Sequence, residues 1–288
     1  MSRRGFTLAE VLVAMVVMSI LGLALIQVLI GNAHFVSRQD TMMEARLTAR
    51  AAMYSMIGEL QDVSDGGLLA ASKDSVTLRV PYAFGMLCGT KGVTTASLLP
   101  ADSLTYATAL PDSVAVRTDS GAYVVLRVTS VSGTPDPAEC TADSIRVVPG
   151  GTLIGLTIQG PAPPAGALFF LSQPVTYHFR PSVDLPGRRA LWRRAGSVAY
   201  EEMAAPFDSS ARFAFLMQRD LAHADTRATF PTAPKHHAAA LDSVRGLELR
   251  LTGASVATPQ GASGPQTFAL WPRVIFGNKM YVADSLIY

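Results

Sequence analysis

The sequence predicts an α+β fold in which one long N-terminal α-helix precedes a mainly antiparallel β globular domain. Two observations predict the helix: residues 11–30 carry no charged side chain, and no proline occurs before Pro81. One observation predicts the sheet, because beyond Gly67 apolar and polar residues alternate in short segments, which is typical of half-buried strands. The 288 residues are 49% hydrophobic and 16% charged. This composition excludes a disordered chain and allows one large or two modest globular units.

Composition and motifs also limit the function. The net charge is +2, from 24 basic and 22 acidic residues, so no global field recruits nucleic acid or an acidic substrate. The chain has two cysteines, too few for a disulfide-dense scaffold or a four-cysteine zinc site. It lacks a Gly-x-Ser-x-Gly elbow, a His-Glu-x-x-His motif and a dinucleotide-binding glycine run. We therefore expect no enzyme, no cofactor and no metal site.

Residues 11–30 form a candidate membrane span. Twenty residues of helix reach about 30 Å, the thickness of the bilayer's hydrocarbon core. Arg3 and Arg4 precede the span, and the positive-inside bias would keep that end in the cytoplasm. We expect a single pass through the inner (cytoplasmic) membrane, with the rest of the chain exported.

The charge of Glu10 helps to distinguish between the possible kinds of membrane span. A secretory signal peptide cleaved near residues 31–33 and a plain signal anchor are both compatible with an apolar run. An ionised carboxylate within a membrane helix costs about 2.5–3.5 kcal/mol, which calls for a cationic partner and argues against both. The remaining simple interpretation is that Glu10 lies in the headgroup zone.

The residues around Glu10 carry a family resemblance. Residues 3–12, RRGFTLAEVL, resemble the class III signal of type IV prepilins and type II secretion pseudopilins. The resemblance implies cleavage between Gly5 and Phe6 by a prepilin peptidase, N-methylation of Phe6, and a pilin-like fold. It also implies these partners: other minor pilins or pseudopilins, a major pilin, an inner-membrane assembly platform and membrane lipid. Glu10 would then neutralise the Phe6 ammonium of a neighbouring subunit.

Four segments follow from these observations. We expect a leader at 1–5, a transmembrane or filament-core helix at 6–30, an amphipathic continuation at 31–65 and an exported β-rich domain at 66–288. Gly31 is the expected place for a bend, because glycine lowers helix propensity by about 1 kcal/mol. Apolar residues in the continuation recur at helical spacings and are expected to form its packing face: Phe35, Met42, Met43, Leu47, Met53, Ile57 and Leu60.

Six segments of the exported domain are predicted to be strands: 76–80, 114–117, 124–128, 145–148, 175–180 and 247–251. Asp-Ser pairs at Asp74, Asp112, Asp143 and Asp242 are interpreted as turns that open strands. Residues 205–224 are predicted to form either a short helix or a strand, and residues 254–266 are predicted to form a loop.

The resemblance extends into this domain. An Ala-Arg-rich helix end, a strand at 175–177, its return at 191–193 and a late strand at 244–251 are similar in order to PilW-type minor pilins and J-type (GspJ-like) pseudopilins. The implied function is a minor pilin or pseudopilin that assembles into, primes or caps a filament for pilus biogenesis, type II secretion or DNA uptake. The alternative is a signal-anchored periplasmic binding or enzymatic domain.

The exported domain also contains two cysteines, an arginine cluster and a histidine pair. A bridge between Cys88 and Cys140, both exported, would contribute at most roughly 4 kcal/mol; the alternative is two unrelated thiols. Arg188, Arg189, Arg193 and Arg194 flank Leu191 and Trp192, which suits an anionic ligand or a solvated hairpin, and we expect no specific nucleic-acid partner. His236 and His237 are interpreted as an exposed loop pair, because neighbouring strand residues face opposite ways.

Overall fold

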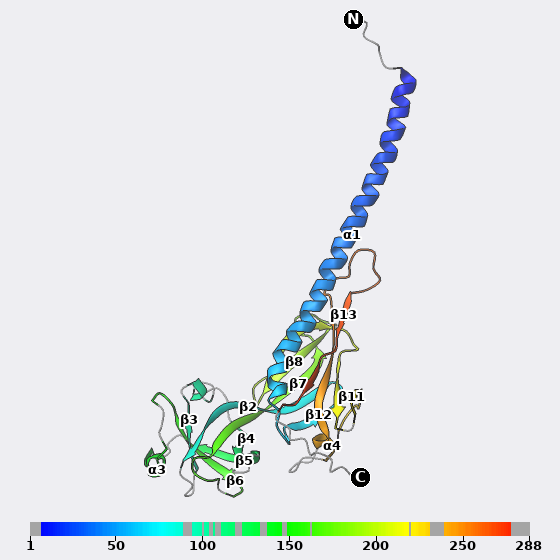
Figure 1. Cartoon of the computed structure of the whole chain (residues 1–288). Helices are drawn as coiled ribbons and strands as arrows, with labels where there is room; N and C mark the ends of the chain where they lie inside the picture. The colour runs from blue at the N-terminus through cyan, green and yellow to red at the C-terminus, as the bar shows by residue number, and fades with distance from the viewer. Residues whose placement is uncertain are drawn as a thin grey trace.

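The computed structural model describes residues 7–88, 94–99, 101–103, 106, 111–118, 123–132, 137–145, 149–161, 163–218, 220–230 and 239–277. One long helix leads from the N-terminal end into two β lobes that lie at its far end (Figure 1). This arrangement confirms the predicted class, an α+β fold with a long apolar helix followed by mainly antiparallel sheet.

Helix α1 (Leu8–Gln61) contains 54 residues, which corresponds to about 81 Å. It runs without interruption through Gly31 with only a gentle curve (Figure 1). A Cβ at Gly31 would meet no atom within 4 Å, so close packing does not require a glycine at this position. The bend expected there is absent, because one glycine costs too little to distort so long an apolar helix.

The face by which α1 packs on the sheet differs from the predicted one. Leu60 is buried, and Met53 and Ile57 pack partly against the core, but Phe35, Met43 and Leu47 are about 60% exposed. Mostly small residues occupy the seam instead: Thr41, Ala45, Thr48, Ala49, Ala52, Met56 and Leu60. The helix lies so close to the sheet that large side chains fit only towards its far end.

The first lobe is an antiparallel sheet on which α1 packs. Its strands follow in the spatial order β1 (Leu68–Ala71), β2 (Ser75–Cys88), β7 (Leu168–Pro181), β8 (Arg189–Ala195), β9 (Glu201–Phe207), β12 (Val244–Ala254), β10 (Arg212–Met217) and β11 (Asp220–Asp225). Strands β13 (Thr267–Leu270) and β14 (Arg273–Ile275) also pair with β12, which α4 (Ala239–Asp242) precedes. Tyr177, Phe213 and Phe215 fill the core between this sheet and α1.

The second lobe is a small closed barrel. Among the described residues, six strands pair in a ring: β2, β3 (Thr94–Leu98), β6 (Leu153–Gln159), β5 (Tyr123–Ser132), β4 (Ser113–Arg117) and β7, which pairs again with β2. Its interior is a separate apolar core that includes Leu98, Leu126, Leu156 and Phe169. A helical turn, α3 (Pro137–Ala142), belongs to the same lobe.

Strands β2 and β7 run through both lobes. Their pairing extends from Ser75 opposite His178 to Met86 opposite Leu168, with an irregularity between Pro81 and Ala83. On one side of this irregularity the strands face the α1 core, and on the other they face the barrel core.

Five of the six predicted strand segments lie within β2, β4, β5, β7 and β12. In the sixth, Ile145 is outside any strand and 146–148 lie outside the described residues. The described residues of 205–224 include the end of β9, all of β10 and most of β11, so the strand alternative was correct there. Asp-Ser opens β2, β4 and β12. The pair at Asp143 follows α3, where Ser144 has a φ of 59° and Ile145 lies outside any strand.

We predict that Gly253→Ala destabilises the chain, because a Cβ there would overlap the carbonyl oxygen of Ala45 on α1. The free energy of unfolding should fall by about 1–3 kcal/mol. The matched control is Gly58→Ala, where a Cβ would meet nothing within 4 Å and better helix propensity should add about 0.5–1 kcal/mol. Urea unfolding of the full chain in detergent, followed by circular dichroism, measures both. Equal effects of the two substitutions would contradict the close packing of α1 on β12.

Candidate functional site: the N-terminal helix and its anchorage

The N-terminal half of α1 projects beyond both lobes (Figure 1). Its apolar side chains are exposed on every side, for example Leu8 at 81% and Met18 at 73%. A contiguous apolar surface of this extent marks a membrane or protein contact. By length and composition, α1 is also able to cross a membrane.

Glu10 takes part in the start of this helix. The Thr7 backbone N–H donates to Glu10 Oε2 at 2.9 Å and the Thr7 hydroxyl donates to the same oxygen at 3.0 Å. In return, the Glu10 N–H donates to Thr7 Oγ1 at 3.3 Å. This is a capping box, which satisfies two otherwise unpaired helix-end groups. The Thr-x-x-Glu spacing is visible in the sequence, but it was not recognised there as a capping box, because Glu10 was interpreted as a membrane charge and as the partner of a neighbouring Phe6 ammonium. Gly5 and Phe6 lie outside the described residues.

The far end of α1 is fixed to the sheet by a polar cluster of Glu59, Tyr177 and Arg193. The Tyr177 hydroxyl donates to Glu59 Oε2 at 2.6 Å, and Arg193 forms an ion pair with Glu59. Burial, together with the Glu59 charge, raises the pKa of Tyr177 above its ordinary value. The phenol therefore stays protonated and acts as a donor. Because the three groups come from α1, β7 and β8, their contact sets the position of the helix on the sheet.

The arginines around Trp192 are mostly engaged inside the fold. Arg193 pairs with Glu59, and Arg189 pairs with Asp74 at 2.8 Å. The guanidinium of Arg194 lies 4.7 Å from the centre of the Tyr200 ring. The pairing of Arg193 with Glu59 could not be predicted from the sequence, because the two residues are 134 positions apart.

Cys88 and Cys140 are joined by a disulfide, with their Cα atoms 4.7 Å apart. Both residues are fully buried. The bond connects the end of β2 to α3, so it cross-links two segments of the barrel lobe.

Metal ligands are not gathered in the part of the chain that the structure describes. No three His, Cys, Asp or Glu side chains there lie close enough to hold an ion. His236 and His237 fall outside that part.

Comparison with known proteins gives one match, at the N-terminal end of the chain. Residues 1–26 match the prokaryotic N-terminal methylation motif. The chain thus carries a type IV pilin-like prepilin signal, which points to a structural protein of the pilin type anchored in a membrane. Comparisons with curated proteins and with solved structures each gave no match.

We predict that the disulfide forms in the exported protein. Alkylation of the unfolded, unreduced monomer should label no thiol, and labelling after reduction should modify both cysteines. Replacing both by serine should lower the free energy of unfolding by at most roughly 4 kcal/mol, because the bridge closes a long loop in the unfolded chain. Two labelled thiols before reduction would reject the bridge.

Proposed function

We propose that the chain is a minor pilin or pseudopilin that assembles through α1 into a type IV pilus-like filament, or primes or caps one. The observation that carries this proposal is the methylation motif at 1–26 at the start of a helix whose apolar N-terminal half the described residues of both lobes leave exposed. In this proposal the N-terminus starts in the cytoplasm, the lobes are exported across the inner membrane, and a prepilin peptidase cuts between Gly5 and Phe6.

The apolar surface of α1 extends well past the membrane span, which supports assembly over simple anchoring. One stripe of exposed side chains has successive members seven or four positions apart: Met18, Leu25, Leu29, Val36, Met43, Leu47 and Tyr54. We call this set the α1 stripe. Spacings of seven and four keep residues on one face of a helix, as in helix-to-helix packing.

The α1 stripe faces away from the sheet. Met43 and Leu47 lie two positions on either side of Ala45, and two positions rotate by roughly 200° around an α-helix. Ala45 is fully buried against the sheet, whereas Met43 and Leu47 are 63% and 61% exposed. A signal anchor needs no apolar face beyond the bilayer. A helix that packs beside the helices of other subunits does.

Within the pilin-like class we propose a PilW-type minor pilin or a J-type secretion pseudopilin. The order that supports this is a Val-Thr-Tyr segment in β7, a return strand β8 and a late strand β12.

The role that we propose for Glu10 depends on assembly. In the separate chain its carboxylate is held by Thr7. Cleavage before Phe6 would create an α-ammonium, and in the filament the carboxylate of one subunit would neutralise the ammonium of the next. Such a pair would also set the register between neighbours.

We predict that the mature chain begins at Phe6, since the motif places Gly5 immediately before the cut. Intact-mass analysis of protein from cells with and without a prepilin peptidase measures this, and N-methylation of Phe6 should add the mass of one methyl group. Glu10→Ala should give the same mature start. A start near residue 34 would instead indicate an ordinary signal peptide and would overturn the proposal.

We also predict that Leu47→Glu lowers the fraction of the chain recovered with filaments or partner subunits by at least about tenfold. A carboxylate in an apolar helix contact loses its hydration without a partner, at a cost of a few kcal/mol. Glu10→Ala should lower recovery in the same assay. The control is Val183→Glu, the same kind of change at a side chain that is 72% exposed on a different part of the molecule. Unchanged recovery of Leu47→Glu and Glu10→Ala would favour a signal-anchored domain unrelated to filaments.

A further inference from the structure

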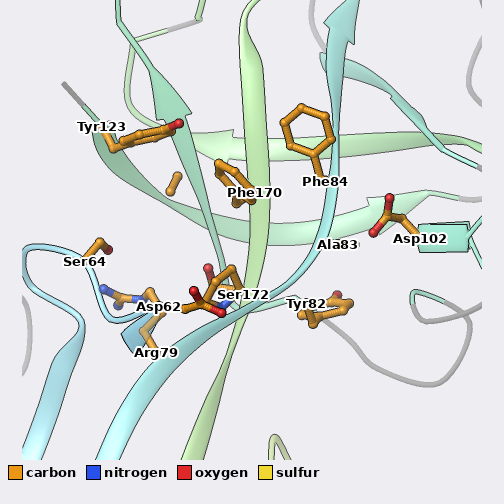
Figure 2. A pocket seen from close by; sticks show the side chains of 12 residues that line it. Asp62, Ser64, Arg79, Tyr82, Ala83, Phe84, Asp102, Tyr123, Phe170 and Ser172 are labelled. Atoms are coloured by element: carbon orange, nitrogen blue, oxygen red, sulfur yellow. The ribbon is translucent and has the colours of Figure 1, made fainter. Parts of the chain in front are cut away.

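A hollow of about 350 Å³ opens where the barrel meets the end of α1 (Figure 2). Its walls come from β2, β4, β5 and β7 of the barrel, from the helical turn at 101–103, and from the segment that follows α1. A volume of this size falls within the range of small-molecule sites. The proposed assembly helix does not use it.

One wall of the hollow is aromatic. Phe84 on β2 lies opposite Phe170 on β7, with ring centres 5.1 Å apart. Tyr123 on β5 continues the row, 5.7 Å from Phe170. These rings lie on the outside of the barrel, because Phe169 and Leu171 on either side of Phe170 fill its interior. Tyr123 is 41% exposed, so the row offers ring surface to a ligand.

The other walls carry charges of both signs (Figure 2). Asp62 and Asp102 provide carboxylates, which accept hydrogen bonds when ionised. Arg79 provides a guanidinium, which only donates. Its Nη1 donates to the Gly66 carbonyl at 3.1 Å, and this bond holds the group in place.

Arg79 also adds an unused polar atom. Arg79 lines the hollow, and its Nε is buried and has no hydrogen-bond partner within the described chain. Buried polar groups in native proteins nearly always have a partner, so such a group needs an explanation. A ligand in the hollow would supply one.

These features together select one class of ligand. An anion in the hollow would be repelled by Asp62 and Asp102, and a cation would have to lie beside the guanidinium of Arg79. A purely apolar molecule would leave the Nε of Arg79 unpaired. What remains is a neutral molecule with an apolar face and an edge of groups that both donate and accept.

We propose that the hollow binds a neutral saccharide of one or two rings. The C–H face of a sugar ring would lie on Phe170 and Tyr123, whose negative ring faces attract it. Its hydroxyls would donate to Asp102 and accept from Arg79. The hollow lies at Gln61, about 47 Å of helix beyond Ile30, so a filament subunit would present it far from the membrane.

Saturation-transfer NMR on the full chain, in a detergent without a sugar headgroup, tests the proposal. The probes are the methyl glycosides of glucose, galactose, mannose and N-acetylglucosamine, with glucuronate and glucosamine as charged counterparts. We expect transfer to the ring protons of at least one neutral glycoside, and weaker transfer to the charged sugars. Failure of the filament proposal would not affect this result, because the assay needs neither cleavage nor assembly.

Variants locate the binding. Tyr123→Ala and the isosteric Asp102→Asn should each raise the Kd by about tenfold or more, while Tyr123→Phe, which keeps the ring, should stay near the wild-type value. Tyr54→Ala is the matched control, because that tyrosine is 72% exposed on α1, away from the hollow. The proposal is overturned if no neutral glycoside shows transfer, if a charged sugar binds best, or if binding persists unchanged in Tyr123→Ala and Asp102→Asn.

Discussion

The pairing of β2 with β7 is the interaction on which the rest of the structure depends. Each strand has 14 residues, far more than the usual five or six, and their ladder contributes to two hydrophobic cores. Near Ser75 it supports α1, and near Met86 it closes the barrel. The hydroxyls of Thr77 and Thr176 bond across it at 3.0 Å. Because both lobes share these two strands, the barrel and the hollow beside it are held in a fixed relation to the end of α1.

Helix α1 meets two different packing demands along its length. From Thr41 onwards one face lies against a sheet, and close approach requires small residues such as Ala45 and Ala49. The opposite face keeps large apolar side chains such as Leu47 exposed. Between residues 11 and 30 no apolar side chain of the helix is buried against the described part of the chain. One part of the helix is therefore buried when the chain folds. The other part keeps an apolar surface that a membrane or another subunit would cover.

This division explains what the sequence could and could not predict. Periodicity correctly indicated the long helix and most of the strands. It placed Leu47 in the packing face because hydrophobicity alone does not say which of two apolar faces a sheet will cover. The closed barrel was not predicted, since Met86 meets Leu168 across a long insertion and β3 has the unremarkable sequence TTASL. The motif around Glu10 could be recognised because its residues are neighbours in the sequence. Glu59 and Arg193 come together only in the folded chain, as do Asp62 and Phe170, which line the same hollow.

Several charged side chains form ion pairs within the fold and are therefore not available to bind partners. Glu59 pairs with Arg193 and Asp74 with Arg189. Glu248, 5% exposed, lies between Arg250 and Arg273; burial raises its pKa, yet the two arginines outweigh this and lower the pKa below its ordinary value. These pairs join α1 to the sheet and strands to one another, and a net charge of +2 remains. With so many charges neutralised internally, long-range attraction has little part in choosing partners. Recognition then depends on contact surfaces, and the α1 stripe and the aromatic hollow supply two that share no residue.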